Sequence, residues 1–241
     1  MTVVVTGGGS GIGLAVCRVA IERGLAVVAL DVNPGAASAA GAAAVACDVR
    51  DEAAVEAAIG AVEDLDALVC CAGVDASGLA HEIDTDTWRR ILDVNLLGTH
   101  LSCRAALRSF LQRGRPGAIV CVSSPTAFAA IPGGTTAYSA SKGGVSALVR
   151  TLAIDYARHG IRVNALVPGS TETPLMWANV PEAEVTAVRA ALERSIPLGR
   201  LGATEEIAAA CLWLCSPEAS YVTGSHLVVD GGLLARLAVD V

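Results

Sequence analysis

Short apolar runs alternate with longer amphipathic segments, and this alternation limits the fold more than any other feature of the chain. The apolar runs are rich in valine and barely alternate with polar residues, which is typical of parallel strands covered on both faces. The predicted strands are Thr2–Thr6, Ala26–Leu30, Ala43–Ala46, Ala67–Cys70, Ala118–Val122, Arg162–Val167 and His226–Val229. The predicted helices are Gly11–Arg23, Glu52–Glu63, Thr85–Gln112, Thr136–Arg158, Glu182–Arg194 and Glu205–Leu214. Elements of these lengths predict an α/β fold with a doubly wound sheet.

Length and charge limit the possible functions. A chain of 241 residues without a linker, repeat or charge block suits a single domain over residues 1–241. It has 17 Lys and Arg against 24 Asp and Glu, hence a net charge of −7, and no basic run. Nucleic acid and anionic membranes are therefore poor candidates for partners. Only 3% of the residues are aromatic, which leaves little for base stacking.

No segment has the pattern of a membrane span. The uncharged stretch Pro116–Ser141 is broken by Pro125, Pro132 and two adjacent glycines, so a buried strand followed by a loop fits it better. Strand character begins at Thr2, which leaves no room for a signal peptide, and we expect a cytoplasmic protein.

The eight cysteines form neither a Cys-x-x-Cys motif nor a Cys/His cluster with zinc spacing, so no metal site is predicted. Most lie in apolar strand or helix patterns and are interpreted as small, buried, reduced residues.

A glycine-rich turn follows the first predicted strand and precedes the first helix. It reads Thr6-Gly7-Gly8-Gly9-Ser10-Gly11-Ile12-Gly13. Glycines let the backbone turn sharply and approach a pyrophosphate, and the helix N-terminus behind them favours negative charge. No Gly-Lys-Ser/Thr follows, which excludes a Walker motif. The turn is therefore predicted to bind a dinucleotide.

Asp31 ends the second predicted strand, twenty residues after Gly11. A carboxylate at this place accepts hydrogen bonds from the hydroxyls of the adenosine ribose and repels a 2′-phosphate. Neither Ser10 nor the segment Val32–Gly35 offers an arginine or lysine for such a phosphate. NAD is therefore predicted over NADP.

Lys142 is the only lysine of the chain, and it follows Tyr138 by four residues. On a helix that spacing places both side chains on one face, a turn apart. An ammonium beside a phenol favours the phenolate, so we expect the pKa of Tyr138 to lie far below its usual value of about 10. Tyr138 would then transfer protons near neutral pH.

In their order along the chain, these motifs resemble the short-chain dehydrogenase/reductase family. The resemblance covers essentially the whole chain, and it implies a single Rossmann-type domain with a mostly parallel seven-stranded sheet, a nicotinamide cofactor and reversible alcohol–ketone oxidoreduction. The matching motifs are Thr6-Gly7-x-x-x-Gly11-Ile12-Gly13, Asp48-Val49, Ala72-Gly73, Asn95, Ser123-Ser124, Tyr138-x-x-x-Lys142, Arg162-Val163-Asn164, Pro168-Gly169, Thr223-Gly224 and Asp230-Gly231-Gly232.

The resemblance implies roles for the matching residues. Tyr138 would be the general acid/base, and Lys142 would lower its pKa and hold the hydroxyls of the nicotinamide ribose. Asn95 would interrupt its helix and hold a water that links Lys142 to solvent. The other implied cofactor contacts are Asp48 and Val49 to adenine, Ala72 and Gly73 to the passing cofactor, Pro168 and Gly169 after the sixth strand, and Thr173, with Thr171 as a second candidate, to the carboxamide.

The chain departs from the family pattern at two places. Cys70-Cys71-Ala72-Gly73 stands where Asn-Asn-Ala-Gly is usual, and we expect no loss of activity from this. The serine that binds the substrate oxygen usually precedes the tyrosine by thirteen residues, a count that lands on Pro125. Ser124 is fourteen residues away and Ser123 fifteen, so Ser124 is the predicted residue and Ser123 the alternative.

The segment after the sixth strand, within residues 173–201, is predicted to be a lid over an apolar pocket. Such a pocket suits a cyclic or aryl-linked secondary alcohol, and the flanking motifs Pro168–Thr173 and Ile196–Gly199 are similar to those of dihydrodiol dehydrogenases. The predicted activity is therefore the NAD-dependent interconversion of a small secondary alcohol, with a cyclic alcohol or a diol as candidates, and its ketone. The apolar residues of the segment are Leu175, Met176, Trp177, Val180, Val185 and Val188.

Two other functions stay open. A 3-oxoacyl-thioester reductase would need a basic entrance for its carrier, for which the candidates are Arg113, Arg115, Arg189 and Arg194. A non-catalytic dinucleotide-binding sensor or scaffold is the alternative of another class. The resemblance also implies a homotetramer, with one interface from Leu101–Gln112 and Ala137–Arg158 and another from Leu227–Val241.

Overall fold

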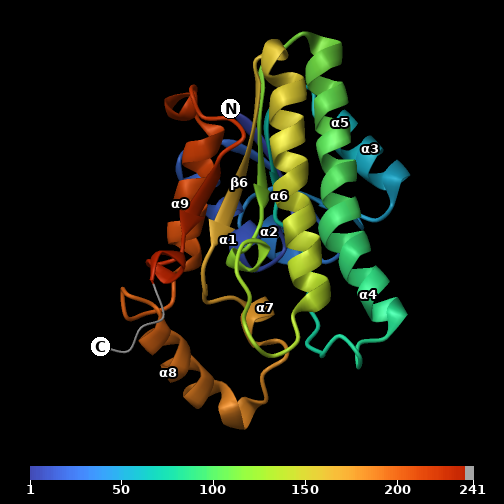
Figure 1. The fold of residues 1–241 in the computed structure, drawn as a ribbon. Coiled ribbons are helices and arrows are strands. Elements are labelled where there is room, and N and C mark those ends of the chain that lie inside the picture. The colour runs from blue at the N-terminus through green and yellow to red at the C-terminus, as the bar shows by residue number, and fades with distance from the viewer. Residues whose placement is uncertain (237–241) are drawn as a thin grey trace.

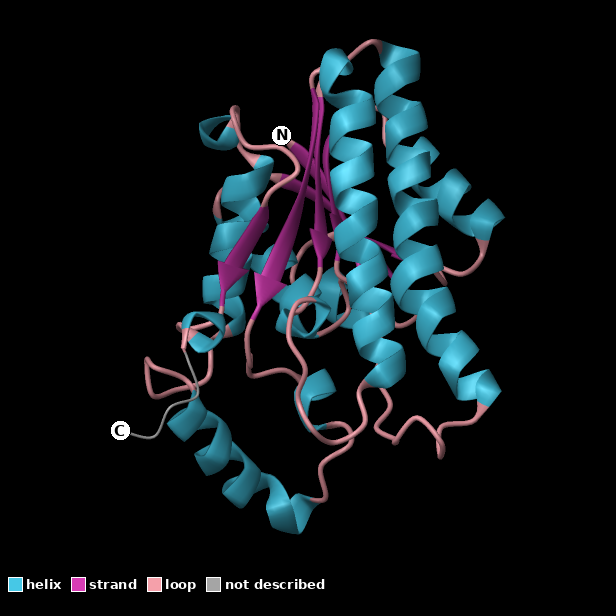
Figure 2. Ribbon diagram, in the orientation of Figure 1, coloured by secondary structure: helices cyan, strands magenta, loops and turns pink. Residues whose placement is uncertain are grey.

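The computed structural model describes residues 1–236, and within them seven strands form one entirely parallel sheet (Figures 1 and 2). The strand order is β3-β2-β1-β4-β5-β6-β7, so the predicted doubly wound α/β fold is confirmed. The strands are β1 Thr2–Thr6, β2 Ala26–Asp31, β3 Ala43–Ala46, β4 Leu65–Cys70, β5 Gly117–Val122, β6 Ile161–Pro168 and β7 His226–Val229.

Helices cover both faces of the sheet because successive strand residues point to opposite faces. Val4 contributes to a core beneath α3 (Glu52–Gly60), α5 (Gly98–Arg113) and α6 (Thr136–Tyr156). Val3 and Val5 contribute to a second core beneath α1 (Gly11–Glu22) and α9 (Thr204–Cys215). The short α2 (Gly35–Ala39) adds Ala37 to the second core. Burial on both faces explains why the strands lack alternation.

The long helix predicted over Thr85–Gln112 is interrupted. The structure has α4 over Thr85–Leu92, a five-residue π-helical turn over Asp93–Leu97, and then α5. Such a turn inserts one extra residue and is frequent at functional sites. It brings Asn95 to the carboxyl edge of the sheet, where its side chain bonds to the loop after β4.

The predicted lid segment lies beyond the carboxyl ends of the strands, apart from the two helical layers (Figure 1). It contains α7 (Pro174–Trp177) and α8 (Val185–Ser195), which a 3₁₀ turn, Glu182–Glu184, precedes. No residue of α8 is buried. Glu172, which lies shortly after β6, accepts two hydrogen bonds from Arg189, at 2.6 and 2.7 Å, and one from Trp177, at 2.7 Å. These bonds connect both helices of the lid segment to the chain that leaves β6.

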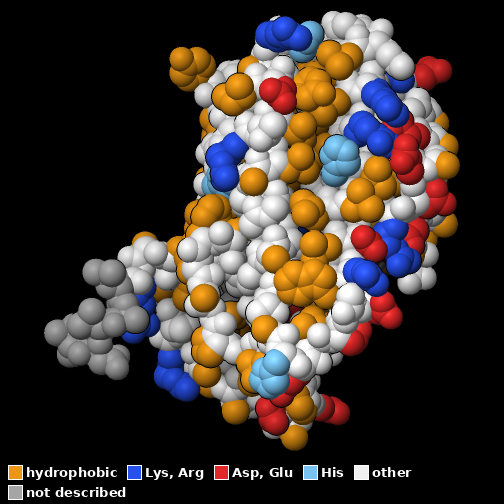
Figure 3. All heavy atoms as spheres, turned by 45° about the vertical axis from the view of Figure 1, so that its right-hand side comes forward, with side chains coloured by type: hydrophobic (Ala, Val, Ile, Leu, Met, Phe, Trp, Pro, Cys, Tyr) orange, Lys and Arg blue, Asp and Glu red, His pale blue; other side chains and the backbone are white. Residues whose placement is uncertain are grey.

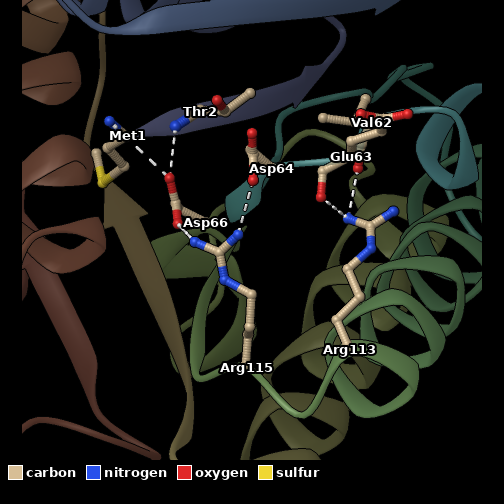
Figure 4. A network of polar contacts seen from close by, with 8 residues as sticks. All are labelled: Met1, Thr2, Val62, Glu63, Asp64, Asp66, Arg113 and Arg115. Carbon is tan, nitrogen blue, oxygen red and sulfur yellow. Dashed lines mark hydrogen bonds and ion pairs between the residues drawn. The ribbon is translucent and has the colours of Figure 1, made fainter.

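Two candidates for a basic entrance, Arg113 and Arg115, lie beside the amino ends of the strands, at the opposite end of the sheet from the lid segment (Figure 4). Arg115 pairs with Asp64 at 2.9 Å and with Asp66 at 3.1 Å, beside the amino ends of β1 and β4. Arg113 donates to the backbone carbonyls of Val62 and Glu63. Both guanidinium groups are therefore engaged in hydrogen bonds and ion pairs far from the carboxyl ends of the strands.

Hydrophobic side chains form a broken stripe on the face that α5 and α6 cover, between charged residues (Figure 3). Ile154 on α6 is 79% exposed and Leu111 on α5 is 41% exposed. The homotetramer stays a prediction, and residues 237–241 of its predicted interface segment Leu227–Val241 lie outside the described residues. Within residues 1–236 no helix combines the length and apolar character that crossing a membrane needs.

Candidate active site

The glycine-rich turn is packed too tightly for side chains. Gly7 has a left-handed φ of 69°, and a Cβ on it would lie 2.6 Å from the backbone nitrogen of Ala72. A Cβ on Gly13 would lie 2.1 Å from the carbonyl oxygen of Gly7. These approaches bring the ends of β1 and β4 together at the start of α1. The first turn of α1, with Ser10 at its N-cap, therefore faces the carboxyl edge of the sheet with free backbone N–H groups.

Asp31 ends β2 beside this turn, as predicted. One carboxylate oxygen accepts from the backbone N–H of Gly9 at 2.9 Å, and the other accepts from that of Asn33 at 2.8 Å. These bonds fix the orientation of the carboxylate, and each oxygen keeps a second acceptor position.

The predicted adenine-side residues follow β3. Val49 is buried and Asp48 is half-buried. Arg50 donates to both oxygens of Asp48, and this pairing holds the pKa of Asp48 below its usual range.

The two candidate threonines after β6 differ in their surroundings. Thr171 is buried, and its hydroxyl donates to the carbonyl of Gly169 at 2.9 Å. Thr173 is the N-cap residue of α7, and its side chain lies close to Gly11, since a Cβ on Gly11 would be 3.5 Å from the Cβ of Thr173. Of the two threonines, Thr173 is therefore the one beside the glycine-rich turn. Pro168 is the last residue of β6. Gly169 packs against Asp230, since a Cβ on Gly169 would lie 2.6 Å from the Cα of Asp230.

Lys142 and Tyr138 share a face of α6, as the spacing predicts. Lys142 is only 4% exposed, and its Nζ donates to the carbonyl of Val122, the last residue of β5, at 2.8 Å. The same Nζ lies 5.6 Å from the ring centre of Tyr138 and 3.7 Å from where a Cβ on Gly73 would be. The buried ammonium therefore lies among the ends of β4 and β5 and the phenol.

The predicted low pKa of Tyr138 is wrong in this structure. The pKa of Tyr138 is raised to about 12, first by burial and then by the charge of Asp75, while a hydrogen bond with Ser124 acts in the opposite direction. Burial also lowers the pKa of Lys142 to about 8. Spacing alone indicated the proximity of the two groups, but it carried no information on the loss of water around them, which dominates both shifts.

The two candidate serines point in different directions. The hydroxyl of Ser124 bonds to the phenol of Tyr138, and it accepts from the hydroxyl of Thr126 at 3.0 Å. Ser123 faces α6 instead, where its hydroxyl lies 2.8 Å from that of Ser146. The structure thus brings Ser124, and not Ser123, to Tyr138.

Asn95 joins three elements. Its side chain accepts from the Val74 N–H at 2.8 Å and donates to the Val74 carbonyl at 2.9 Å, and it also donates to Ser141 on α6 at 3.1 Å. Its backbone carbonyl accepts from Thr99 at 2.7 Å. The predicted interruption of the helix is therefore present, while the water that Asn95 would hold stays a prediction.

Sequence spacing missed two features. The thiols of Cys70, Cys103 and Cys121 lie within 4.8 Å of one another in the core. They come from β4, α5 and β5, so no local motif could reveal them. They are surrounded by apolar side chains, which supports their interpretation as core residues. Asp75, on the loop after β4, was also missed, because nothing in its sequence context marks it.

The residues at this edge fit a nicotinamide dinucleotide. The close backbone approaches at Gly7 and Gly13 and the helix start suit a pyrophosphate, and the carboxylate of Asp31 lies where a ribose would pass. The Tyr138 and Lys142 pair lies at the far end of this path, beyond the point between β1 and β4 where the strand order reverses. Ligands of doubly wound folds bind at such points.

Comparison with known proteins finds relatives that match nearly the whole chain. A family model described as enoyl-(acyl carrier protein) reductase matches residues 7–234. The chain is 43% identical over 245 residues to cis-4-hydroxycyclohexanecarboxylate dehydrogenase of Sinomonas cyclohexanicum, covering 96% of each chain. It is 40% identical over 246 residues to 3β-hydroxysteroid dehydrogenase 1 of Eggerthella lenta, covering 96% of this chain and 93% of that one.

Among solved structures, the aldohexose dehydrogenase of Thermoplasma acidophilum matches with a TM-score of 0.92 at 31% identity, covering 100% of this chain and 96% of that one. The chain belongs to the short-chain dehydrogenase/reductase family. It is therefore an oxidoreductase of a family whose dehydrogenases use nicotinamide dinucleotides.

The raised pKa of Tyr138 can be measured because the chain has only three tyrosines, Tyr138, Tyr156 and Tyr221. The near-ultraviolet phenolate absorbance of the wild type, minus that of Tyr138→Phe, isolates the one phenol. Since burial disfavours the charged form, no ionisation of Tyr138 is expected below about pH 10 in the protein without added cofactor. A difference signal that titrates near pH 8 would contradict this assignment.

Proposed function

We propose that this protein is an NAD-dependent dehydrogenase that interconverts a secondary alcohol and its ketone by hydride transfer. The observation that carries the proposal is the convergence of Ser124, Tyr138 and Lys142 at the end of the path prepared for a dinucleotide. Three groups from two elements meet there, and each supplies something that an alcohol dehydrogenase needs: an oxygen-binding hydroxyl, a proton carrier and a fixed positive charge.

NAD, when bound, supplies the hydride acceptor, and the protein supplies position and proton transfer. In alcohol oxidation Ser124 holds the substrate oxygen, and the deprotonated Oη of Tyr138 takes the hydroxyl proton. The ammonium of Lys142, 5.6 Å from the centre of the Tyr138 ring, favours that deprotonated form and would hold the ribose hydroxyls of the cofactor. In ketone reduction the protonated phenol returns the proton to the carbonyl oxygen. Asn95 acts indirectly, because its bonds to Val74 and Ser141 position the β4 loop against α6.

The surroundings of Asp31 support NAD over NADP. A carboxylate fixed by two backbone N–H groups can accept from ribose hydroxyls, and it would repel a 2′-phosphate at the same place. The nearby segment Val32–Gly35 has no basic residue, and Arg50 is already paired with Asp48.

The substrate we propose is a small secondary alcohol with a ring or several hydroxyls. The lid segment offers apolar side chains, of which Leu175 is 39% exposed. The named relatives include a dehydrogenase for cis-4-hydroxycyclohexanecarboxylate, a ring alcohol that also carries a carboxylate, and one for an aldohexose. An acyl-carrier substrate is less well supported, because Arg113 and Arg115 are paired at the opposite edge of the sheet and Arg189 is paired with Glu172.

The function is tested by the absorbance of the reduced cofactor during turnover of cyclic and polyhydroxylated secondary alcohols, with NAD⁺ and NADP⁺ compared. We expect turnover with NAD⁺ at a catalytic efficiency at least tenfold above that with NADP⁺. Replacing Asp31 by Ala should narrow this ratio, because the repulsion of the 2′-phosphate is lost. Activity confined to oxoacyl thioesters with NADPH would overturn the proposal.

The site assignment is tested by two matched pairs of variants. Tyr138→Phe removes the proton carrier and should lower kcat by roughly 10²–10⁴-fold or more, whereas Tyr156→Phe is the control. Ser124→Ala should also lower kcat strongly, while Ser123→Ala should retain most of it, because Ser123 faces α6. Near-wild-type turnover of Tyr138→Phe would contradict the mechanism. A wild type that binds NAD but oxidises no alcohol would favour the sensor alternative.

A further inference from the structure

Asp75 is an acidic side chain beside the reacting groups to which the mechanism above gives no role. It lies on the loop after β4, two residues beyond Gly73, and is half-buried. Its charge acts on Tyr138 and also on Lys142, which lie on α6. An acidic group at this place disfavours anionic substrates, and it adds a hydrogen-bond acceptor to the site.

The loop holds Asp75 in position from both sides. On one side, Asn95 makes two hydrogen bonds to the backbone of Val74, at 2.8 and 2.9 Å. On the other side, the N–H of Gly78 donates to the carbonyl of Gly134 at 3.0 Å, in the segment that leads into α6. The carboxylate is therefore fixed relative to the start of α6, where Tyr138 lies, rather than carried on a free loop.

One carboxylate oxygen of Asp75 is left for a ligand. Its Oδ1 accepts from the N–H of Ala76 at 2.8 Å, which orients the group. Across residues 1–236, Oδ2 has neither a hydrogen-bond donor nor a cation within ion-pair distance. An ionised carboxylate can only accept, so whatever binds Oδ2 must donate.

We propose that Asp75 binds a second hydroxyl of the substrate, and that the site is built for a diol or polyol with a hydroxyl next to the carbinol that is oxidised. The inference rests on the proposed function and deepens it. A neutral hydroxyl fits better than an amine, because the ammonium of Lys142 beside Asp75 repels a second cation. Asp75 is thus a specificity-determining residue that distinguishes a diol from the corresponding simple alcohol.

The test compares kcat/KM for matched alcohol pairs with NAD⁺: cyclohexanol against cyclohexane-1,2-diol, and butan-2-ol against butane-2,3-diol. The variants are Asp75→Ala, Asp75→Asn and the control Glu82→Gln, which alters an exposed carboxylate of the same loop. The readout is the diol-to-alcohol ratio. Any effect of the Asp75 charge on proton transfer by Tyr138 acts on both substrates and cancels in this ratio.

We expect the wild type to prefer the diols and Asp75→Ala to lower the ratio by roughly 10- to 100-fold, as for a lost hydrogen bond to a charged group. Asp75→Asn keeps an acceptor oxygen, so its diol-to-alcohol ratio should lie between those of the wild type and Asp75→Ala. Glu82→Gln should leave the ratio unchanged. An unchanged ratio in Asp75→Ala, or an equal loss for both members of each pair, would overturn the inference and leave the proposed function intact. A wild type that oxidises none of the four alcohols would overturn both.

Discussion

The site is organised around one buried charge, the ammonium of Lys142. Removing an ammonium from water is unfavourable unless it is paired and hydrogen-bonded, and here a single carbonyl, that of Val122, accepts from it. Burial accordingly lowers the pKa of Lys142 to about 8. Lys142 is the only lysine of the chain, and a compact ammonium differs from a planar guanidinium in size and in the geometry of its donors.

The topology of the sheet explains why the charge lies where it does. The strand order reverses between β1 and β4, and the chain leaves these strands in opposite directions around the sheet, so their carboxyl ends open a crevice. Gly7 and Ala72 close the bottom of this crevice by direct backbone contact. The π-helical turn at Asn95 then ties the loop after β4 to α6. The proposed cofactor path, proton carrier and substrate side thus meet at the carboxyl ends of the strands.

Much of the fold could be predicted from the sequence, because burial on both faces leaves a plain valine pattern in each strand. The dinucleotide turn was recognisable because glycine is required wherever two backbones touch, as at Gly7. What failed were effects that depend on three-dimensional surroundings. The interruption at Asn95 was implied by the family resemblance, whereas periodicity alone predicts a continuous helix over Thr85–Gln112, because a one-residue insertion hardly changes the periodicity. The pKa of Tyr138 was predicted in the wrong direction because neighbouring charges can be counted in a sequence, whereas lost hydration cannot. The proximity of Asp75 to Tyr138 depends on how the loop after β4 packs against α6, and the sequence does not reveal this packing.

We propose that Lys142 serves the reaction at the expense of stability, and the unfolding of a Lys142→Met variant tests this proposal. Because the pKa of Lys142 is about 8 in the folded protein and 10.5 in the reference state, the unfolded chain binds more protons between these values. The free energy of unfolding of the wild type should therefore rise relative to that of the variant as the pH increases from about 8 to 10.5. In urea unfolding near pH 7, the account predicts that Lys142→Met is more stable than the wild type by roughly 1–3 kcal/mol and has lost alcohol oxidation. A variant that is less stable at pH 7 and still oxidises alcohols would contradict it.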